Sequence, residues 1–224
     1  MLLTAAYTLS KSMDQASDDD SVPLFNAAAY QYRNYAVSDY DRRHNFEVGF
    51  TAELPFGSGH LFLHDRGLAN AIAGGWKING VVSKFTGLPF TPTASSTSLN
   101  AAFNTQVANQ VNPNVSTLGG IGKFVTYFDT TAFTPVTTAA FGNAGRNSLR
   151  GPGHGDLDLG ISRTFPITEY THLELRGEGF NVTNSPYFAV PGNNVSSSSF
   201  GHITSTFGSS ADSRVIRVTG KLTF

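Results

Sequence analysis

Six separate segments of this chain alternate apolar and polar residues, and this alternation constrains the fold more than any other feature of the sequence. Successive side chains of a β-strand point to opposite faces, so the pattern predicts strands with one apolar and one polar face. The six segments are residues 3–9, 46–54, 76–85, 156–165, 173–180 and 214–224. Most are close to the ~9–11 residues with which a strand crosses a membrane.

The last segment shows the pattern most clearly. Ile216, Val218 and Leu222 fall on one face of residues 214–224. Arg217 and Lys221 fall on the opposite face. Two basic residues in other segments break the rule, because Lys84 and Arg163 land on the apolar faces. A long basic side chain near a strand end reaches from an apolar surface to a polar interface, which accommodates Arg163.

The connections between the segments differ in length. Residues 13–43, 87–155 and 182–213 are long and polar, whereas residues 55–75 and 166–171 are shorter. Outer-membrane barrels have short periplasmic turns and long extracellular loops. If the C-terminus lies in the periplasm, all three long connections lie outside the cell.

We therefore predict an all-β fold: an open, curved antiparallel meander of about six long strands, forming the C-terminal part of a transmembrane β-barrel with long extracellular loops. Residues 1–224 would be a fragment of one barrel domain in the outer membrane of a Gram-negative bacterium, with a periplasmic C-terminus. The smallest such barrel closes with ~8 strands, and Met1 opens directly into a strand pattern without an export signal. We expect further strands and the signal upstream.

A soluble antiparallel sandwich is the alternative fold, because its strands also alternate between a buried and a solvated face. Three features favour the membrane: charges gather on one strand face, glycines interrupt the apolar face, and the loops far exceed the median of ~4–6 residues in compact domains. A terminal aromatic residue adds weight. Phe224 closes an alternating strand and is predicted to be the signal that the barrel-assembly machinery reads.

Composition excludes several classes of function. With 15 basic and 16 acidic residues, the chain has no electrostatic footprint for nucleic acid. It contains no cysteine, and no HExxH or GxSxG motif, so we expect no enzyme activity, no cofactor and no metal centre. Asp14 with Asp18, Asp19 and Asp20 offers oxygen ligands for a divalent cation. A solvated acidic loop is the preferred interpretation.

The charged residues on the polar strand faces are the candidate site. They would face the lumen, where they contact a plug, line a substrate path, or pair with one another for ~0.2–1 kcal/mol per pair. Mutual pairing is the preferred interpretation. The candidates are Glu47, Glu53, Asp156, Asp158, Glu174, Arg176, Glu178, Arg217 and Lys221.

Aromatic residues near the strand ends predict the girdles that mark the two membrane interfaces, although ordinary packing explains them equally well. They are Tyr7, Phe56, Trp76 and Phe165. The glycine-rich residues 142–153 lack the Lys-Ser/Thr ending of a phosphate loop. We interpret them as a chain reversal, in which Arg146 and Arg150 hydrogen-bond loop carbonyls.

Several stretches, in order, resemble motifs of TonB-dependent outer-membrane receptors, in particular the Oar-like proteins that carry an N-terminal carboxypeptidase-regulatory-like domain. The resemblance spans almost the whole chain. It rests on YTLSKSMD at 7–14, SDYDRRH at 38–44, ELPFG at 53–57, GGWKING at 74–80, TGLPFT at 86–91, FDTTAF at 128–133, FGNAGRNSLRGPG at 141–153 and RGEGFNVTN at 176–184.

This resemblance implies uptake of an unidentified, scarce or bulky ligand through a larger, plugged barrel, powered from the inner membrane by the TonB complex. Neither plug nor TonB box lies in these 224 residues, so contact with TonB would pass through a missing N-terminal part. The implied role is a wall of the transporter with some of its external loops, surrounded by outer-membrane lipid. An adhesion or structural barrel without import is the first alternative, and a soluble β-rich binding module is the second.

Overall fold

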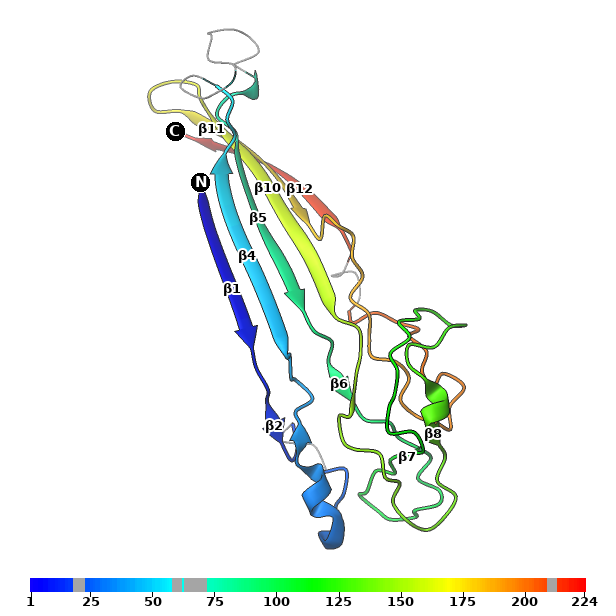
Figure 1. The fold of residues 1–224 in the computed structure, drawn as a ribbon. Helices are drawn as coiled ribbons and strands as arrows, with labels where there is room; N and C mark the ends of the chain where they lie inside the picture. Colours follow the sequence, from blue (N-terminus) through cyan, green and yellow to red (C-terminus); the bar gives the residue numbers. More distant parts are fainter. Residues whose placement is uncertain (18–22, 58–61, 63–71, 209–212) are drawn as a thin grey trace.

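The computed structural model describes residues 1–17, 23–57, 62, 72–208 and 213–224. Six long strands form one antiparallel sheet in which strand order follows chain order (Figure 1). They are β1 Leu2–Leu9, β4 His44–Glu53, β5 Lys77–Phe85, β10 His154–Pro166, β11 His172–Phe180 and β12 Val215–Thr223. The sheet is open between β1 and β12. The predicted all-β antiparallel meander is therefore confirmed.

The strand register merges the six apolar faces into one continuous surface. Residues directly opposite each other on paired strands share a face, so a row can be followed across the whole sheet. One such row runs through Leu3, Phe50, Gly80, Leu159, Gly179 and Ile216. Along each strand, the residues immediately before and after these point to the opposite, polar face.

Glycine on the apolar face makes room for larger neighbours. A Cβ atom at Gly80 would lie 2.7 Å from a ring carbon of Phe50 and 2.8 Å from a methyl carbon of Leu159. These two side chains come from the flanking strands and lie over the glycine. The glycines that interrupt the apolar alternation therefore belong to the packing of this face.

The connections sort by length to the two ends of the sheet. The described parts of residues 54–76, and residues 167–171, lie at one end, which we call the turn end, together with both chain termini (Figure 1). The described parts of residues 10–43 and 181–214, and residues 86–153, lie at the other end, the loop end. The alternation of long and short connections that the sequence predicted is confirmed.

The three long connections fold together into a single body, which we call the loop body. Its first part contains β2 Met13–Asp14, the 3-10 helix η1 Ala28–Asn34 and β3 Ala36–Val37. Its second part contains four short strands, which form two separate pairs, and one 3-10 helix. They are β6 Pro89–Phe90, β7 Asn109–Gln110, η2 Thr130–Ala132, β8 Phe133–Thr134 and β9 Leu149–Arg150.

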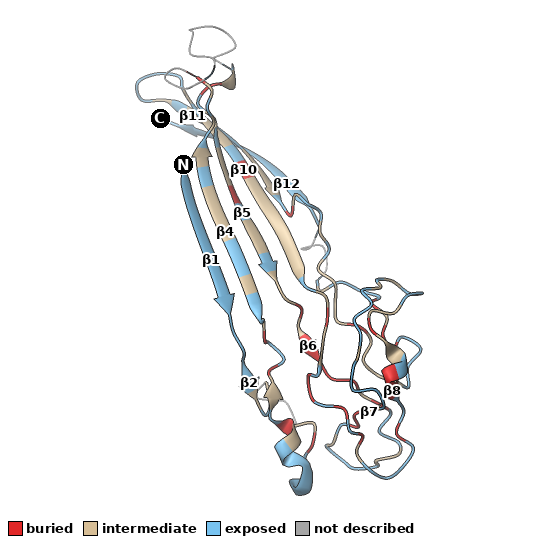
Figure 2. Cartoon of the chain, viewed as in Figure 1, coloured by how far each residue is buried: buried red, intermediate tan, exposed pale blue. Residues whose placement is uncertain are grey.

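The hydrophobic core of the described residues lies in the loop body rather than against the sheet (Figure 2). Each long connection contributes, for example with Phe25, Phe90 and Phe200. Phe128 lies at the centre, with its ring centroid 5.3 Å from Phe200, 5.8 Å from Phe90 and 6.0 Å from Phe133. The apolar face of the sheet stays open to its surroundings. In the described part of the chain, no helix is both long and apolar enough to span a membrane.

Candidate functional site

The nine candidate charges lie on one face of the sheet, the polar face. The register places Glu174 directly opposite Lys221, and Glu178 directly opposite Arg217. Opposite charges therefore face each other between β11 and β12, an arrangement that stabilises a strand pair modestly. Glu47 and Asp156 lie in one row on either side of Ser83.

Two ion pairs that involve Lys or Arg form on this face among the described residues, and His154 Nε2 lies 3.8 Å from Asp156 Oδ1. Arg176 Nε lies 3.2 Å from Glu178 Oε1 within β11. Lys77 Nζ lies 3.2 Å from Glu53 Oε1, joining β5 to β4. Lys77 is a further polar-face charge that was not among the predicted candidates, although its position next to Trp76 in the alternation places it on that face. Arg217 lies over the Phe180 ring, 5.5 Å from the ring centroid.

Asp158 has a local structural role. Its Oδ1 accepts a hydrogen bond of 2.7 Å from the backbone N–H of Asn181, which follows β11. Asn181 adopts a left-handed conformation with φ of +47°, and its side chain holds both backbone groups of Ser185. Asparagine tolerates this conformation better than most residues. Asp158 and Asn181 thus end β11 and direct the chain into the third long connection.

Arg146 joins the first and second long connections. Its side chain is 5% exposed. It donates to the carbonyl oxygens of Asp14 and Asn34, each at 3.0 Å. It also donates to Asp14 Oδ1 at 2.6 Å, Ser17 Oγ at 2.7 Å and Asp39 Oδ1 at 3.2 Å. The planar guanidinium, with five N–H donors in fixed directions, suits this set of acceptors.

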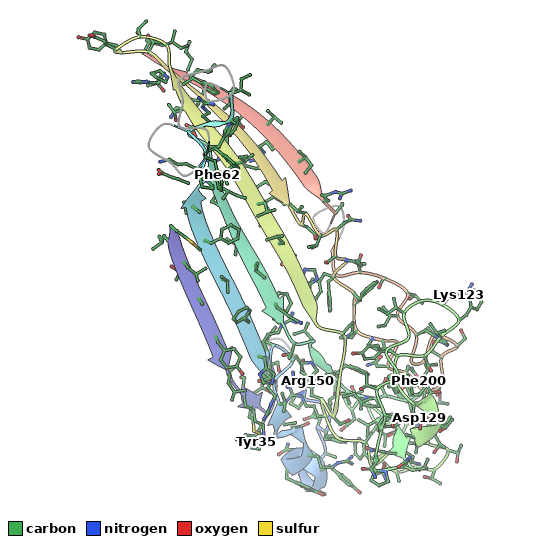
Figure 3. The ribbon with its side chains drawn as sticks, turned by 45° about the horizontal axis from the view of Figure 1, so that its top comes forward. Tyr35, Phe62, Lys123, Asp129, Arg150 and Phe200 are labelled. Carbon is green, nitrogen blue, oxygen red and sulfur yellow. The ribbon has the colours of Figure 1, made fainter. Side chains whose placement is uncertain are left out.

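Asn147 and Arg150 extend this junction. Asn147 donates through Nδ2 to Val37 O at 2.6 Å and to Asp39 Oδ1 at 2.5 Å. Arg150 donates to the carbonyl oxygens of Asp41 and Gly87, and forms an ion pair with the Asp41 carboxylate. Hydrogen bonds from Arg146 and Arg150 to loop carbonyls are thus present, as the sequence suggested. Figure 3 shows Arg150 beside the ends of the long strands, and Phe200 farther out in the loop body.

The carboxylates at this junction have lowered pKa values. Burial by itself raises the pKa of Asp41, but the hydrogen bonds from the Ser12 backbone and from Arg150, and the charge of Arg150, bring the pKa below its usual value. For Asp14, burial likewise opposes the hydrogen bonds from Ser17 and Arg146, and the net pKa is again lowered. Both groups are therefore ionised at neutral pH.

Arg33 and Arg42 complete the set of arginines that hold the loop body. Arg33 donates to Gly142 O at 2.8 Å and Ala144 O at 3.1 Å, and its guanidinium lies 4.1 Å from the Phe25 ring centroid. Burial lowers the pKa of Arg33. Arg42 donates to Thr86 O at 2.7 Å.

An aromatic cluster covers the polar face at the loop end. Phe85 and His154, opposite each other on β5 and β10, contact Tyr187 of the third connection at centroid distances of 5.6 and 4.9 Å. The Phe207 ring packs against Tyr187 in a tilted arrangement, with ring centroids 4.9 Å apart, and Arg42 donates a hydrogen bond to the Tyr187 hydroxyl. The third connection therefore folds back over the polar face. A cavity of about 380 Å³ lies nearby, and its lining includes Ser17, Asp39, Phe90, Asn147, Val190 and Phe207.

The predicted girdle residues lie near the two ends of the sheet. At the turn end, Trp76 contacts Phe165 edge to face at 6.4 Å, and Phe56 contacts Phe62 at 5.9 Å. At the loop end, the Tyr7 hydroxyl and His44 Nδ1 are 2.8 Å apart. Phe224 follows β12 and is 93% exposed.

Among the residues that the structure describes, no group of three or more His, Asp or Glu side chains is arranged to hold a metal ion. Asp14 is occupied by Arg146. Asp18, Asp19 and Asp20 lie outside the described residues.

Comparison with known proteins gives a family. Neither the curated proteins nor the solved structures contain a significant match. One family model, the outer membrane beta barrel domain, matches residues 1–217. An open sheet of six antiparallel strands, with one continuous apolar face, agrees with a segment of a barrel wall. The chain therefore belongs to the outer membrane β-barrel domain family, and is part of a membrane barrel protein of the outer membrane.

Proposed function

We propose that this chain forms part of the wall, and part of the external lid, of a TonB-dependent transporter that takes up an unidentified ligand. One observation carries the proposal. Residues from separate receptor-like motifs, 38–44, 86–91 and 141–153, converge at the Arg146–Asn147–Arg150 junction of the loop body. These motifs therefore share one task, which is to hold a folded lid beside the polar face.

The proposed orientation places the loop body outside the cell and Phe224 in the periplasm. It is supported by the segregation of the three long connections to one end of the sheet. Single cysteines test it, because the 224 residues contain none. In the full-length protein, Phe124→Cys in the loop body should react with a membrane-impermeant maleimide on intact cells. Tyr170→Cys in a turn-end connection should react only after the outer membrane is permeabilised. The reverse pattern would invert the orientation.

Coupling to TonB is tested with the full-length protein purified from native outer membranes. The purified periplasmic domain of TonB from the same bacterium serves as the probe. We expect it to be retained by the immobilised protein, and to be released by a synthetic peptide copying the TonB box of that protein. Absence of retention would reject the transport proposal and leave a barrel without energy coupling.

An adhesion barrel remains the second candidate, because the loop body exposes tyrosines. Tyr32 is 75% exposed, Tyr40 63% and Tyr35 60%. Exposed aromatic side chains supply large contact area for a partner. The adhesion proposal predicts two results. The wild type does not retain TonB, and the Tyr32→Ser/Tyr35→Ser/Tyr40→Ser variant no longer attaches to surfaces.

We further propose that the polar face lines the lumen and that its charges balance one another next to the plug. Opposed charges in β11 and β12 and the Lys77–Glu53 pair support this proposal. The test is to place cysteines at Arg176 in the barrel and on the plug surface of the full-length protein. A disulfide between them would support contact, whereas cysteines that never cross-link across a scanned plug face would reject it.

A further inference from the structure

The apolar face carries an isolated lysine at the loop end. Lys84 lies on this face between Phe46 of β4 and Gly155 of β10, its direct neighbours across the strands. It is exposed. In the part of the chain that the structure describes, its amine has no ion pair or hydrogen bond. A positive charge on a surface that faces hydrocarbon is costly unless an anion or water meets it.

Gly155 positions this lysine. A Cβ atom at Gly155 would lie 3.4 Å from Lys84 Cγ and 3.2 Å from Ser83 O. The aliphatic stem of Lys84 therefore lies across β10 in the space that the glycine leaves. A long aliphatic stem of this kind lets the charged end reach the membrane interface.

The depth of Lys84 follows from a second cation on the same face. Arg163 lies eight residues along β10 from Gly155, at the turn end, where it donates to Ile72 O at 2.8 Å. Eight residues span about 27 Å of strand, or about 20 Å along the membrane normal at the ~35–45° tilt of barrel strands. The positions between them on β5 and β10 are uncharged: Ile78, Gly80, Val82, Leu157, Leu159 and Ile161. Lys84 thus marks the loop-end border of an uncharged band about 20 Å deep, somewhat less than the ~25 Å apolar band of outer-membrane barrels.

Two recesses flank Lys84. One, of about 460 Å³, includes His44, Phe46 and Lys84 in its lining and is bordered by Thr117 and Tyr127 of the loop body. The other, of about 600 Å³, includes Val82, Lys84 and Leu157 of the apolar face, and its rim reaches His154 and Asp156 of the polar face. A free cation between two largely apolar recesses, at the border of the band, suits an amphiphile with an anionic headgroup and several acyl chains.

We propose that Lys84 binds a phosphate of a phosphorylated glycolipid in the outer leaflet, with acyl chains lying in the two recesses. This inference rests on the proposed orientation, because the outer leaflet of the outer membrane carries such glycolipids. The choice over a phospholipid follows from this orientation, which places Lys84 at the outer leaflet. The loop body, through Thr117 and Tyr127, covers the headgroup side of the site.

The experiment uses the full-length protein purified from outer membranes and placed in phosphatidylcholine nanodiscs. The nanodiscs contain either bisphosphorylated lipid A or phosphatidylglycerol, and native mass spectrometry counts the lipid retained after delipidation. We expect the wild type to retain lipid A and Lys84→Ala to retain about fivefold less, the factor for one basic residue at an anionic membrane surface. Lys84→Arg should keep the lipid. Lys84→Gln, which preserves the stem, replaces Lys84→Ala if that variant does not assemble.

Lys77→Ala is the matched control, because Lys77 lies on the same strand but on the opposite face. It should retain lipid A like the wild type. Three outcomes would each overturn the proposal. Lys84→Ala could retain as much lipid A as the wild type, or Lys77→Ala could lose as much lipid A as Lys84→Ala. The wild type could also retain as much phosphatidylglycerol as lipid A. Failure here is distinguishable from a wrong orientation, because the cysteine labelling described above measures orientation without any added lipid.

Discussion

The sheet and the loop body of this protein are stabilised in opposite ways. The sheet is regular, and none of its six strands contains a buried hydrophobic side chain. The loop body has little regular structure, yet it contains the whole described hydrophobic core and most of the buried polar contacts. The sheet relies on strand pairing and on the surrounding membrane, whereas the loop body is stabilised as a small water-soluble domain is, by its own core.

This contrast matters for function. A lid that folds on its own core keeps its shape when the apolar face exchanges neighbours in the membrane. Its contacts with the sheet include the hydrogen bond from the Asn181 backbone to Asp158, the Arg42 guanidinium over the Phe85 ring, and Tyr187 against Phe85 and His154. The contacts of Arg146 and Arg150 instead join the long connections to one another within the loop body. Substitutions in the loop body should therefore disturb the lid and leave the sheet intact, and the following experiments measure that separation.

The largest effect is expected for Phe128→Ala. Phe128 is 2% exposed at the centre of the core, and truncating a buried phenylalanine costs about 3–5 kcal/mol. Hydrogen exchange of loop-body amides should accelerate, while strand amides of the full-length protein stay protected. Phe124→Ala is the control, because Phe124 is 90% exposed and should change stability by less than about 0.5 kcal/mol. Equal loss of protection in sheet and loop body would refute the separation.

Arg146→Ala should have the next largest effect. It should destabilise the loop body by about 3 kcal/mol, because it leaves the carboxylate of Asp14 without its charged partner. Arg146→Lys should recover little, because a single ammonium group cannot reach the same acceptors. Trypsin cleavage at the exposed Lys123 reports opening of the lid (Figure 3). If Arg146→Lys resisted trypsin as well as the wild type does, the positive charge alone, and not the shape of the guanidinium, would hold the junction.

Acid should loosen the loop body before the sheet. The pKa of Asp41 is lowered in the folded state, so the ionised carboxylate stabilises the folded loop body. This stabilisation is complete above the unfolded pKa, near 3.8, and is lost as the pH falls through the lower folded pKa. Lid opening, measured by the protection of loop-body amides against hydrogen exchange relative to the intrinsic exchange rate at each pH, should stay constant from pH 7 to pH 5 and rise below about pH 4. Asp41→Asn should remove this rise by opening the lid at all pH values. A transition near pH 6 would point to histidine instead.

The smallest effect concerns the sheet itself. A double-mutant cycle on Glu178 and Arg217, opposite each other on β11 and β12, should give a coupling of about 0.2–1 kcal/mol. Unfolding of the full-length protein in urea and lipid provides the measurement. A coupling above about 2 kcal/mol would mean that these charges are buried against a plug and behave like those of the loop body.

The sheet was predictable and the loop body was not. The alternation placed strands at 46–54 and 156–165, and the structure has them at His44–Glu53 and His154–Pro166. It also placed Glu174 and Lys221 on one face. In contrast, the long connections were predicted only as external loops. Nothing periodic distinguishes Phe25, Phe128 and Phe200 from exposed aromatic residues such as Phe103 and Phe124.

The candidate site divides in the same way. The sequence showed that Asp158 lies on the polar face, but its hydrogen bond to the Asn181 backbone depends on how the chain turns after β11. The arginines at 146 and 150 were expected to bind loop carbonyls. Their carboxylate partners Asp14 and Asp41 could not be identified, because 132 and 109 residues separate each pair.

By itself, the sequence determined where the long strands run, which side chains share a face, and which connections are long. These are local properties, because the strand backbone turns every second side chain to the same side whatever it pairs with. Only the tertiary structure decided the register that sets Lys84 between Phe46 and Gly155, and the packing of three distant connections around Phe128. Those contacts join residues far apart in the chain, so they contribute to stability only after the chain has folded and brought those residues together.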